Sequence, residues 1–199
     1  MKLRQIFMTF ACLLVAACSA TVRPSDRTPA STLEPAETLG DTALIELVAK
    51  DFANSADCSD GLGKAGMIVN SYAASARGMV SDEWLHSRMD PEVWAKARSL
   101  TSRLRERNTS WQRMDWSFPA AQDIQVEDLS NVRGYLAYID ISKNVRCVTS
   151  FLLPAISTDG NEALVALKIY SDHGAIAFYV LRRERGEWQI DSHAFFAFI

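Results

Sequence analysis

The sequence predicts an α+β domain in which N-terminal helices pack on one face of a curved antiparallel sheet, formed by a C-terminal meander. Three observations support this fold class. Helical apolar periodicity is confined to the first half of the chain. Short β-rich runs fill the second half, and Gly-containing turns separate them. The chain has 199 residues, 48% of them hydrophobic, which suits one domain with an N-terminal extension.

The first predicted helix begins at Asp41, a good N-cap residue, and ends near Asn54. Its apolar side chains share one helical face: Leu44, Leu47, Val48 and Phe52. A Gly-rich loop is expected over residues 55–66. Residues 67–80 carry conflicting signals, because Met67-Ile68-Val69 favours a strand and the segment 72–76 favours a helix. We expect a helix there.

Two N-cap signals predict two further helices. Ser81, followed by Glu83, starts a short helix to about Met89. Asp90-Pro91 starts the next, because Asp is a preferred N-cap and Pro is favoured at the first helical position. This helix should end near Asn108. Its core stripe is Val93, Ala97, Leu100 and Leu104, and three basic residues off the stripe are expected to form a solvated face: Lys96, Arg103 and Arg107.

Strand patterns dominate after Asn108. Odd and even positions alternate in character from Trp111 to Phe118. Further strands are expected at 124–126, 135–141, 145–153, 163–170, 175–183 and 188–198. Turns are expected at Asp159-Gly160-Asn161, at Ser171–Gly174 and at Arg185-Gly186-Glu187.

The last 45 or so residues resemble the closing meander of uncharacterised bacterial exported domains, and the pattern also suits NTF2-like and cystatin-like folds. The resemblance depends on Asp159-Gly160, on Ala163-Leu164-Val165 and on Gly186-Glu187-Trp188. It implies a fold and transfers no catalytic residue.

The N-terminus has the features of an export signal. Lys2 and Arg4 precede an apolar run from Ile6 to Ala17. A membrane-spanning helix needs about 20 apolar residues, so this run is too short to be one.

The run ends in Leu14-Val15-Ala16-Ala17-Cys18, which resembles the lipobox of bacterial lipoproteins. The resemblance implies that Cys18 receives a diacylglyceryl group, that cleavage occurs before it, and that its new amine is acylated. It also implies outer-membrane sorting in a Gram-negative host, because Ser19 and not Asp follows the cysteine. The alternative is an ordinary secretory signal cut near Ala20.

These features divide the chain into a signal peptide (1–17), a Pro-containing flexible tether (18–40) and a single α+β domain (41–199). Removal of Lys2 and Arg4 leaves 19 basic residues against 24 acidic ones, so the mature formal charge is −5. An acidic chain argues against nucleic acid as a partner. We expect a membrane partner through the N-terminal lipid, and an envelope protein as a second partner.

Cys58 and Cys147 remain as a pair once Cys18 is lipidated, and we predict a disulfide between them in an oxidising compartment. Closing a loop of this length stabilises the fold by roughly 4–5 kcal/mol in the chain-entropy model. Two separately buried free cysteines are the alternative.

Candidates for catalysis are few. Ser171-Asp172-His173 reads as an exposed turn, since catalytic triads are assembled from distant segments. Asp191 and His193 are two residues apart in the last strand, so we expect them to share a face, where a carboxylate could orient a general base. A half-buried pair at a sheet edge is the commoner explanation. Three histidines without short ligand spacing make a metal site unexpected, and no cofactor motif is present.

Aromatic residues suggest a binding role instead. Five tryptophans form either the core or the lining of an apolar pocket on a curved sheet, and the core is the commoner explanation. The C-terminus is apolar on both faces, which predicts an interface at Phe195, Phe196 and Phe198. We therefore expect a non-enzymatic envelope lipoprotein that binds a partner protein or an apolar ligand. The alternatives are an envelope hydrolase using Asp191 and His193, and an accessory subunit of a secretion or assembly complex.

Overall fold

A computed structural model describes residues 35–58, 66–77, 79, 81–118, 121, 123–131, 145–170 and 174–197, and the side chains of 35–39 are outside it. The chain divides into two compact units, residues 1–32 and 33–199, and every described residue belongs to the second. Cys18, the predicted turn at 171–173, the predicted strand at 135–141 and Phe198 therefore lie outside the described residues.

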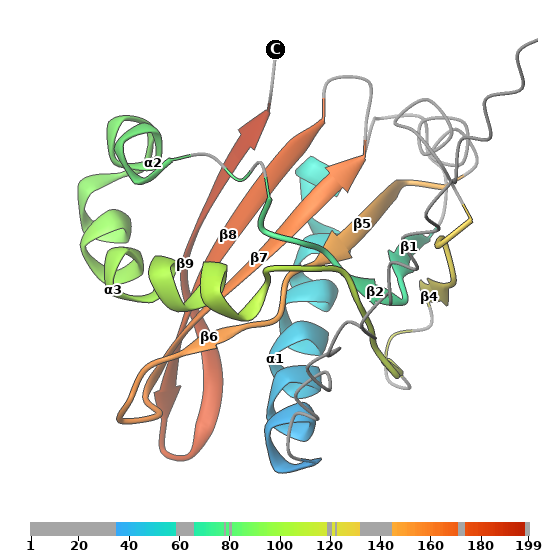
Figure 1. The fold of residues 1–199 in the computed structure, drawn as a ribbon, viewed down its shortest axis with the longest axis horizontal. Coiled ribbons are helices and arrows are strands. Elements are labelled where there is room, and N and C mark those ends of the chain that lie inside the picture. Colours follow the sequence, from blue (N-terminus) through green and yellow to red (C-terminus); the bar gives the residue numbers. More distant parts are fainter. Residues whose placement is uncertain are drawn as a thin grey trace, which may run out of the picture. The chain divides into compact units, whose positions relative to one another are not determined.

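A meander of strands closes the chain after the helices, as predicted, but β1 and β2 lie between α1 and α2 (Figure 1). The helices are α1 (Pro35–Asn54), a 3₁₀ turn (Ala56–Cys58), α2 (Asp82–Arg88) and α3 (Pro91–Arg107). The strands are β1 (Met67–Asn70), β2 (Tyr72–Ala73), β3 (Gln112–Arg113), β4 (Ile124–Glu127), β5 (Cys147–Phe151), β6 (Ala155–Ile156), β7 (Glu162–Tyr170), β8 (Ala175–Glu184) and β9 (Glu187–Ala197).

Seven of these strands form one mixed sheet in the order β4-β1-β5-β7-β8-β9, and β6 pairs with β7 beside the end of β5. β1 runs parallel to both β4 and β5, while the pairs from β5 to β9 are antiparallel. The prediction of a purely antiparallel sheet is therefore wrong at β1. The expected curvature is not confirmed either, because the sheet is not strongly curled. β2 and β3 form a separate two-stranded sheet.

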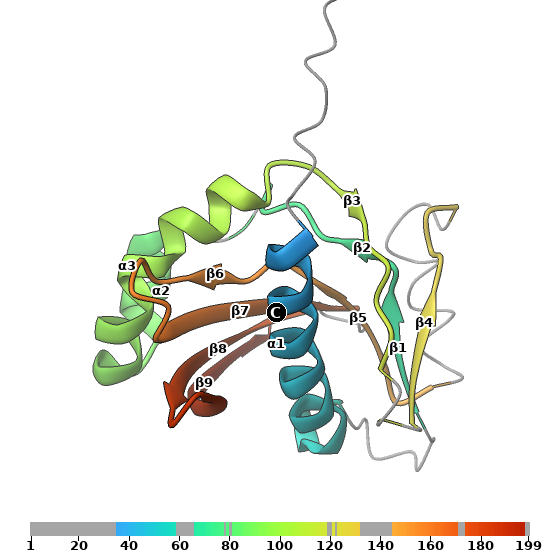
Figure 2. The same cartoon turned by 90° about the horizontal axis from the view of Figure 1, so that it is seen from below.

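Helices cover both faces of the sheet, so the prediction that they pack on one face is wrong. Alternate residues of β7 enter different apolar clusters: Val165 packs with α1, and Leu164 and Ala166 pack with α3. β8 follows the same rule, with Tyr179 on the α1 face and Phe178 on the α3 face. Figure 2 shows α1 and α3 on opposite sides of β7, β8 and β9. Strands buried on both faces need continuous apolar sequences, as β7 and β8 have.

α1 is longer than predicted, because it begins at Pro35 instead of Asp41. Asp41 is therefore an interior helical residue and not the N-cap. The apolar face of α1 is fully buried, with Leu44, Ile45 and Val48 at 0% exposure and Phe52 at 1%. The 3₁₀ turn after α1 carries Cys58, which forms the predicted disulfide with Cys147 at the start of β5, at a Cα–Cα distance of 5.3 Å.

The helix predicted over 67–80 is wrong for the described residues of this segment. Met67–Asn70 forms β1 with all four residues buried, and Tyr72–Ala73 forms β2. The N-cap predictions at Ser81 and Asp90 are confirmed. Ser81 Oγ accepts from the Trp84 N–H, and Asp90 Oδ1 accepts from the Glu92 and Val93 N–H groups. The turn between β8 and β9 is also confirmed, with Arg185 and Gly186 both at positive φ (52° and 88°), as a two-residue hairpin requires.

Candidate functional site

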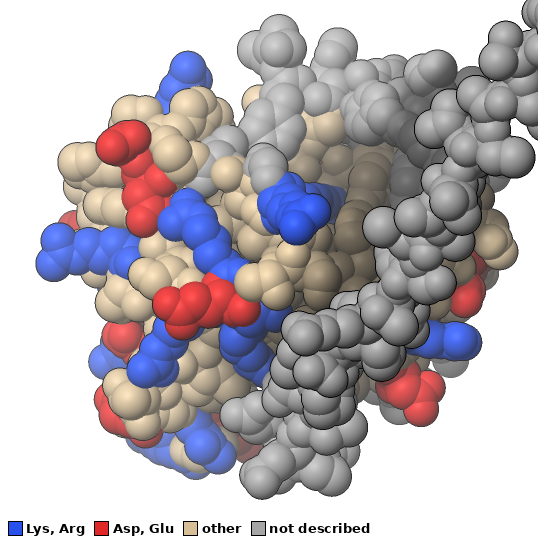
Figure 3. Space-filling model, in the orientation of Figure 1, with Lys and Arg blue, Asp and Glu red and all other residues tan. Residues whose placement is uncertain are grey.

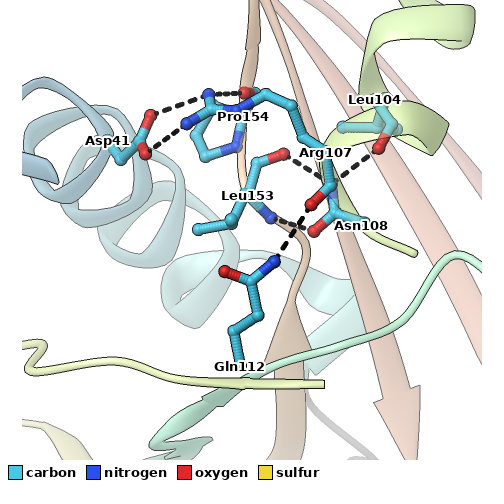
Figure 4. Close-up of polar contacts among 7 residues, drawn as sticks. All are labelled: Asp41, Leu104, Arg107, Asn108, Gln112, Leu153 and Pro154. Carbon is cyan, nitrogen blue, oxygen red and sulfur yellow. Dashed lines mark hydrogen bonds and ion pairs between the residues drawn. The ribbon is translucent and has the colours of Figure 1, made fainter. Parts of the chain in front are cut away.

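The most deeply buried charged residue that the structure describes is Asp41, at 1% exposure. Its carboxylate accepts two bonds from the Arg107 guanidinium, Nη1 to Oδ1 at 3.1 Å and Nη2 to Oδ2 at 2.8 Å (Figure 4). Arg107 Nη1 also donates to the Pro154 carbonyl, between β5 and β6. The pair therefore joins α1 to α3 across the end of the sheet. Such a buried pair is tolerated because its hydrogen bonds are satisfied.

Asn108, the residue after α3, is fully buried and completes this junction. Its amide bonds both main-chain groups of Leu153: Nδ2 donates to the carbonyl at 2.9 Å, and Oδ1 accepts from the N–H at 2.6 Å. Nδ2 also donates to the Leu104 carbonyl at 2.7 Å. The side chain thus replaces a strand partner for the irregular segment between β5 and β6. These contacts stabilise the fold and leave no free group for chemistry.

The basic side chains of α3 contact other elements. The prediction of a solvated face is wrong for Arg103 and Arg107, which are half-buried, and is confirmed for Lys96, which is exposed. Lys96 pairs with Asp191 of β9 at 2.5 Å, and Arg103 donates to the Ile156 carbonyl of β6 at 2.7 Å. Arg105 pairs with Asp82 of α2 at 2.6 Å, and Arg107 pairs with Asp41 as above. On the side of α2 and α3 visible in Figure 3, basic and acidic side chains are interspersed. This arrangement does not favour an anionic partner there.

Asp191 and His193 do not share a face, because a β-bulge breaks the alternation between them. Ser192 lies opposite Val180 and Ile190 lies opposite Leu181, which leaves Asp191 without a partner in the register with β8. Asp191 turns toward α3 and Lys96, whereas His193 stacks on the Tyr179 ring at 5.3 Å on the α1 face.

Lys96 and Ser192 hold the pKa of Asp191 below its usual value, Lys96 having the larger effect. Asp191 is thus an ion-pair partner of α3. No carboxylate in the described part of the chain is hydrogen-bonded to His193. The two residues therefore lack the geometry of an oriented base.

Tyr179 forms a polar contact that sequence reasoning missed. Burial raises the pKa of this phenol, and the Asp51 and Asp57 carboxylates raise it further. The hydroxyl is hydrogen-bonded to Asp51, near the end of α1, so the neutral phenol connects β8 to α1. The apolar pattern of β8 conceals this contact, because a tyrosine in a buried strand looks like another core ring.

Lys168 and Ser150 face each other across β7 and β5. Lys168 donates to the Ser75 and Arg77 carbonyls at 2.8 and 3.4 Å, and burial lowers its pKa. Ser150 is 0% exposed, and its hydroxyl has no hydrogen-bond partner among the described residues. A substrate cannot reach that hydroxyl, so the pair anchors the chain after β2 and is not a catalytic dyad.

Two of the hollows in the described part of the surface are lined by both polar and apolar side chains. One, of about 300 Å³, lies between the end of α1 and the starts of β1, β4 and β5. It is lined by Lys50, Asp123 and Arg146 among others, and Lys50 is paired with Glu46 at 2.8 Å. Neither hollow is the apolar pocket considered for the tryptophans. Trp116 is buried, Trp84, Trp94 and Trp188 are half-buried, and Trp111 is 48% exposed.

The second hollow is a groove of about 500 Å³ between the stretch that leaves β3 and the end of β4. Its lining includes three charged residues, Arg113, Asp115 and Asp128. It also includes Ser71 and the apolar residues Met114, Trp116 and Val126. Arg113 Nη2 lies 4.0 Å from Asp128 Oδ2, a loose ion pair. The pKa of Asp128 is held below its usual value by its hydrogen bonds with Ser130, so it stays an ionised acceptor.

The predicted interface residues lie at the edge of the sheet. Phe195 packs toward the α1 face, while Phe196 packs toward the α3 face, 5.1 Å from the Trp84 ring and 6.2 Å from the Phe178 ring. Phe198 is outside the described residues.

Within the described ranges, no three His, Cys, Asp or Glu side chains are grouped to hold a metal ion. None of the described helices is long and apolar enough to span a membrane. No family model matches the sequence, and no curated protein or solved structure matches it significantly.

Proposed function

We propose that this protein is a lipid-anchored, non-enzymatic lipoprotein of the bacterial envelope, and that it binds an extended segment of an envelope protein along the edge of β9. The observation that carries the proposal is β9 itself. It is an edge strand of eleven residues that pairs with β8 on one side, and no described strand pairs with its other side. Figure 2 shows β9 at the end of the row that starts at β7.

Edge strands present unpaired N–H and C=O groups, and proteins normally protect them with Lys, Pro, bulges or short length. β9 contains neither Lys, Arg nor Pro, and its bulge at Asp191 affects only its first half. The second half, Ser192–Ala197, has no formally charged residue when His193 is neutral. The edge at the opposite end of the sheet, β4, is only four residues long. β9 is therefore the better place for an added strand.

Phe195 and Phe196 supply an aromatic contact on each side of this edge. In strand addition, main-chain hydrogen bonds give affinity, and side chains at alternate positions give specificity. Both rings are half-buried in this structure, which leaves apolar surface for a partner's side chains.

The anchor and the compartment rest on other observations. The lipobox-like sequence before Cys18 supports lipidation, and the Cys58–Cys147 disulfide is compatible with an oxidising envelope compartment. A hydrolase is not favoured, because Asp191 and His193 lie on opposite faces of β9.

Anchoring is tested by intact mass and membrane fractionation of the wild type and Cys18→Ala in a Gram-negative host. The wild type should gain the mass of the acyl groups and stay with the membrane, and the variant should do neither. Equal unmodified masses and solubility would rule out the anchor.

The binding edge is tested by site-specific photo-crosslinking in intact cells. A photoreactive residue at Ala197, on the exposed end of β9, should give a discrete adduct with one protein. The same residue at Ser99, on the exposed face of α3, should not. Ala197→Lys should weaken the interaction detected from a second edge position, Gln189. Equal adducts from Ala197 and Ser99, or none from either, contradict the proposal.

A further inference from the structure

Trp111 and the groove beside β3 form a second surface, far in sequence from β9 and independent of it. Trp111 is the one large hydrophobic side chain that is exposed among the described residues. Burial alternates along the extended stretch that follows it. Trp111, Arg113, Asp115 and Ser117 are exposed, while Met114, Trp116 and Phe118 are buried in the α1-side core.

Side chains two apart in an extended chain share a face, so Trp111, Arg113 and Asp115 form one row. The row spans about 13 Å, at about 3.3 Å per residue. Arg113 and Asp115 also line the groove, with Asp128 as the third charged residue on its walls. The exposed indole thus lies in one row with two charged residues of a groove that is partly polar and partly apolar.

Two buried polar atoms of the groove residues lack hydrogen-bond partners. The Ser71 hydroxyl and the Trp116 indole N–H have none among the described residues, and Trp116 is only 5% exposed. Buried polar groups are nearly always paired, so such atoms on one groove indicate a partner that binds there. The indole N–H is a donor only, whereas the serine hydroxyl both donates and accepts.

The charges of the groove restrict the chemistry of that partner. Two carboxylates against one guanidinium repel an anion such as phosphate. No three His, Cys, Asp or Glu side chains of the described residues are grouped to hold a metal cation. A neutral ligand with many hydroxyl groups fits all of these residues, since each hydroxyl donates to a carboxylate and accepts from a guanidinium or an indole N–H. An indole is both flat and largely apolar, which suits it to stack on the C–H face of a sugar ring.

We propose that Trp111 and this groove bind a glycan chain, with the indole stacked on one sugar ring and the groove residues bonded to hydroxyl groups of the neighbouring ring. Asp128 is not suited to be the acid of a glycoside hydrolase, because that acid needs a raised pKa and the pKa of Asp128 is lowered.

The probes are peptidoglycan sacculi, by co-sedimentation, and the N-acetylglucosamine tetramer, by calorimetry and tryptophan fluorescence, with the purified full-length chain. The wild type should bind both. Trp111→Ala should bind about tenfold more weakly or worse, as for a tryptophan at the centre of an interface. Arg113→Gln should weaken binding less, and Trp111→Phe should restore part of the affinity. Sacculi stripped of their stem peptides should bind equally well.

Arg98→Gln is the matched control, because Arg98 is an exposed arginine on α3 with no ion pair to a described residue. It should bind like the wild type, and so should Ala197→Lys, which alters only the β9 edge. The thermal midpoint of every variant is measured to exclude unfolding. Failure of the wild type to bind either probe, or wild-type affinity in Trp111→Ala, would overturn the proposal. Loss of binding to stripped sacculi would show a peptide ligand and would also overturn it.

Discussion

The two faces of the central sheet are held by different interactions. On the α1 face, a helix with a wide apolar stripe is buried against a large cluster, and a disulfide joins the end of that helix to β5. On the α3 face, α3 buries only Ala97, Leu100, Leu104 and Thr101. It compensates with long basic side chains that reach carbonyls and carboxylates on four other elements. A run of basic residues on a helix can therefore be structural, although it looks like a solvated or anion-binding face.

The largest effect is expected on the α1 face, from removing the disulfide. Cys58→Ser combined with Cys147→Ser should lower the free energy of unfolding by roughly 4–5 kcal/mol, because the cross-link closes a loop between residues 89 apart. Urea unfolding of the oxidised protein and the double variant measures the difference. Reduction of the wild type is the control and should give a similar loss. An unchanged midpoint would show that the cross-link contributes nothing.

The next largest effect is expected from the Asp41–Arg107 pair, which joins the two faces. Arg107→Ala should cost about 3–5 kcal/mol, because it leaves the buried Asp41 carboxylate without its partner. Arg98→Ala, an arginine on the same helix without such a pair, should cost less than about 0.5 kcal/mol. The free energy of unfolding of both variants is measured by chemical unfolding. Similar losses in Arg107→Ala and Arg98→Ala would show that the buried ion pair contributes no more than an exposed arginine does.

A smaller effect is expected from Lys96→Ala, which removes the ion pair with Asp191. The Lys96 side chain is 43% exposed, and ion pairs of this kind contribute about 0.2–1 kcal/mol. Unfolding in low and high salt should show a loss that shrinks as the pair is screened. A loss as large as that of Arg107→Ala would contradict this account.

The smallest expected effect is a dependence of stability on pH, which comes from the Lys96–Asp191 ion pair. The pKa of Asp191 is lower in the folded than in the unfolded chain, so its contribution is present above the unfolded value, near 3.8, and is lost as pH falls through the folded value. The difference in stability between the wild type and Asp191→Asn should therefore be constant near neutral pH and shrink in acid. If the stability difference between the wild type and Asp191→Asn grew in acid, the folded protein would have a raised Asp191 pKa, which would contradict the account.

Local signals in the sequence predicted local structure well. Asp90-Pro91 starts α3, and Arg185-Gly186 turns the chain between β8 and β9, because caps and tight turns depend on a few adjacent residues. The disulfide was also predictable, since Cys58 and Cys147 remain as a pair after Cys18 is assigned to lipid. The alternation in residue character from Trp111 to Phe118 corresponds to alternating burial in the structure, although only Gln112–Arg113 is a strand.

Features that depend on distant pairing were missed. β1 is a short, fully buried run, which periodicity cannot distinguish from a buried helix. It forms because Met67 lies opposite Ile124 and Cys147, far along the chain. The continuous apolar runs of β7 and β8 did indicate that both faces of these strands are buried, and helices on both faces could have been predicted from them. No signal in the sequence indicated the bulge that puts Asp191 and His193 on different faces, since the bulge depends on the register with β8.

The central claim is that the buried Asp41–Arg107 pair stabilises the fold strongly and the exposed Lys96–Asp191 pair only weakly, and a double-mutant cycle tests it most directly. Unfolding free energies are measured for Asp41→Ala, Arg107→Ala and the double variant, and for the matching Lys96 and Asp191 set. The account predicts a coupling above about 2 kcal/mol for the buried Asp41–Arg107 pair and below about 1 kcal/mol for the exposed Lys96–Asp191 pair. A coupling near zero for Asp41 and Arg107 would contradict it.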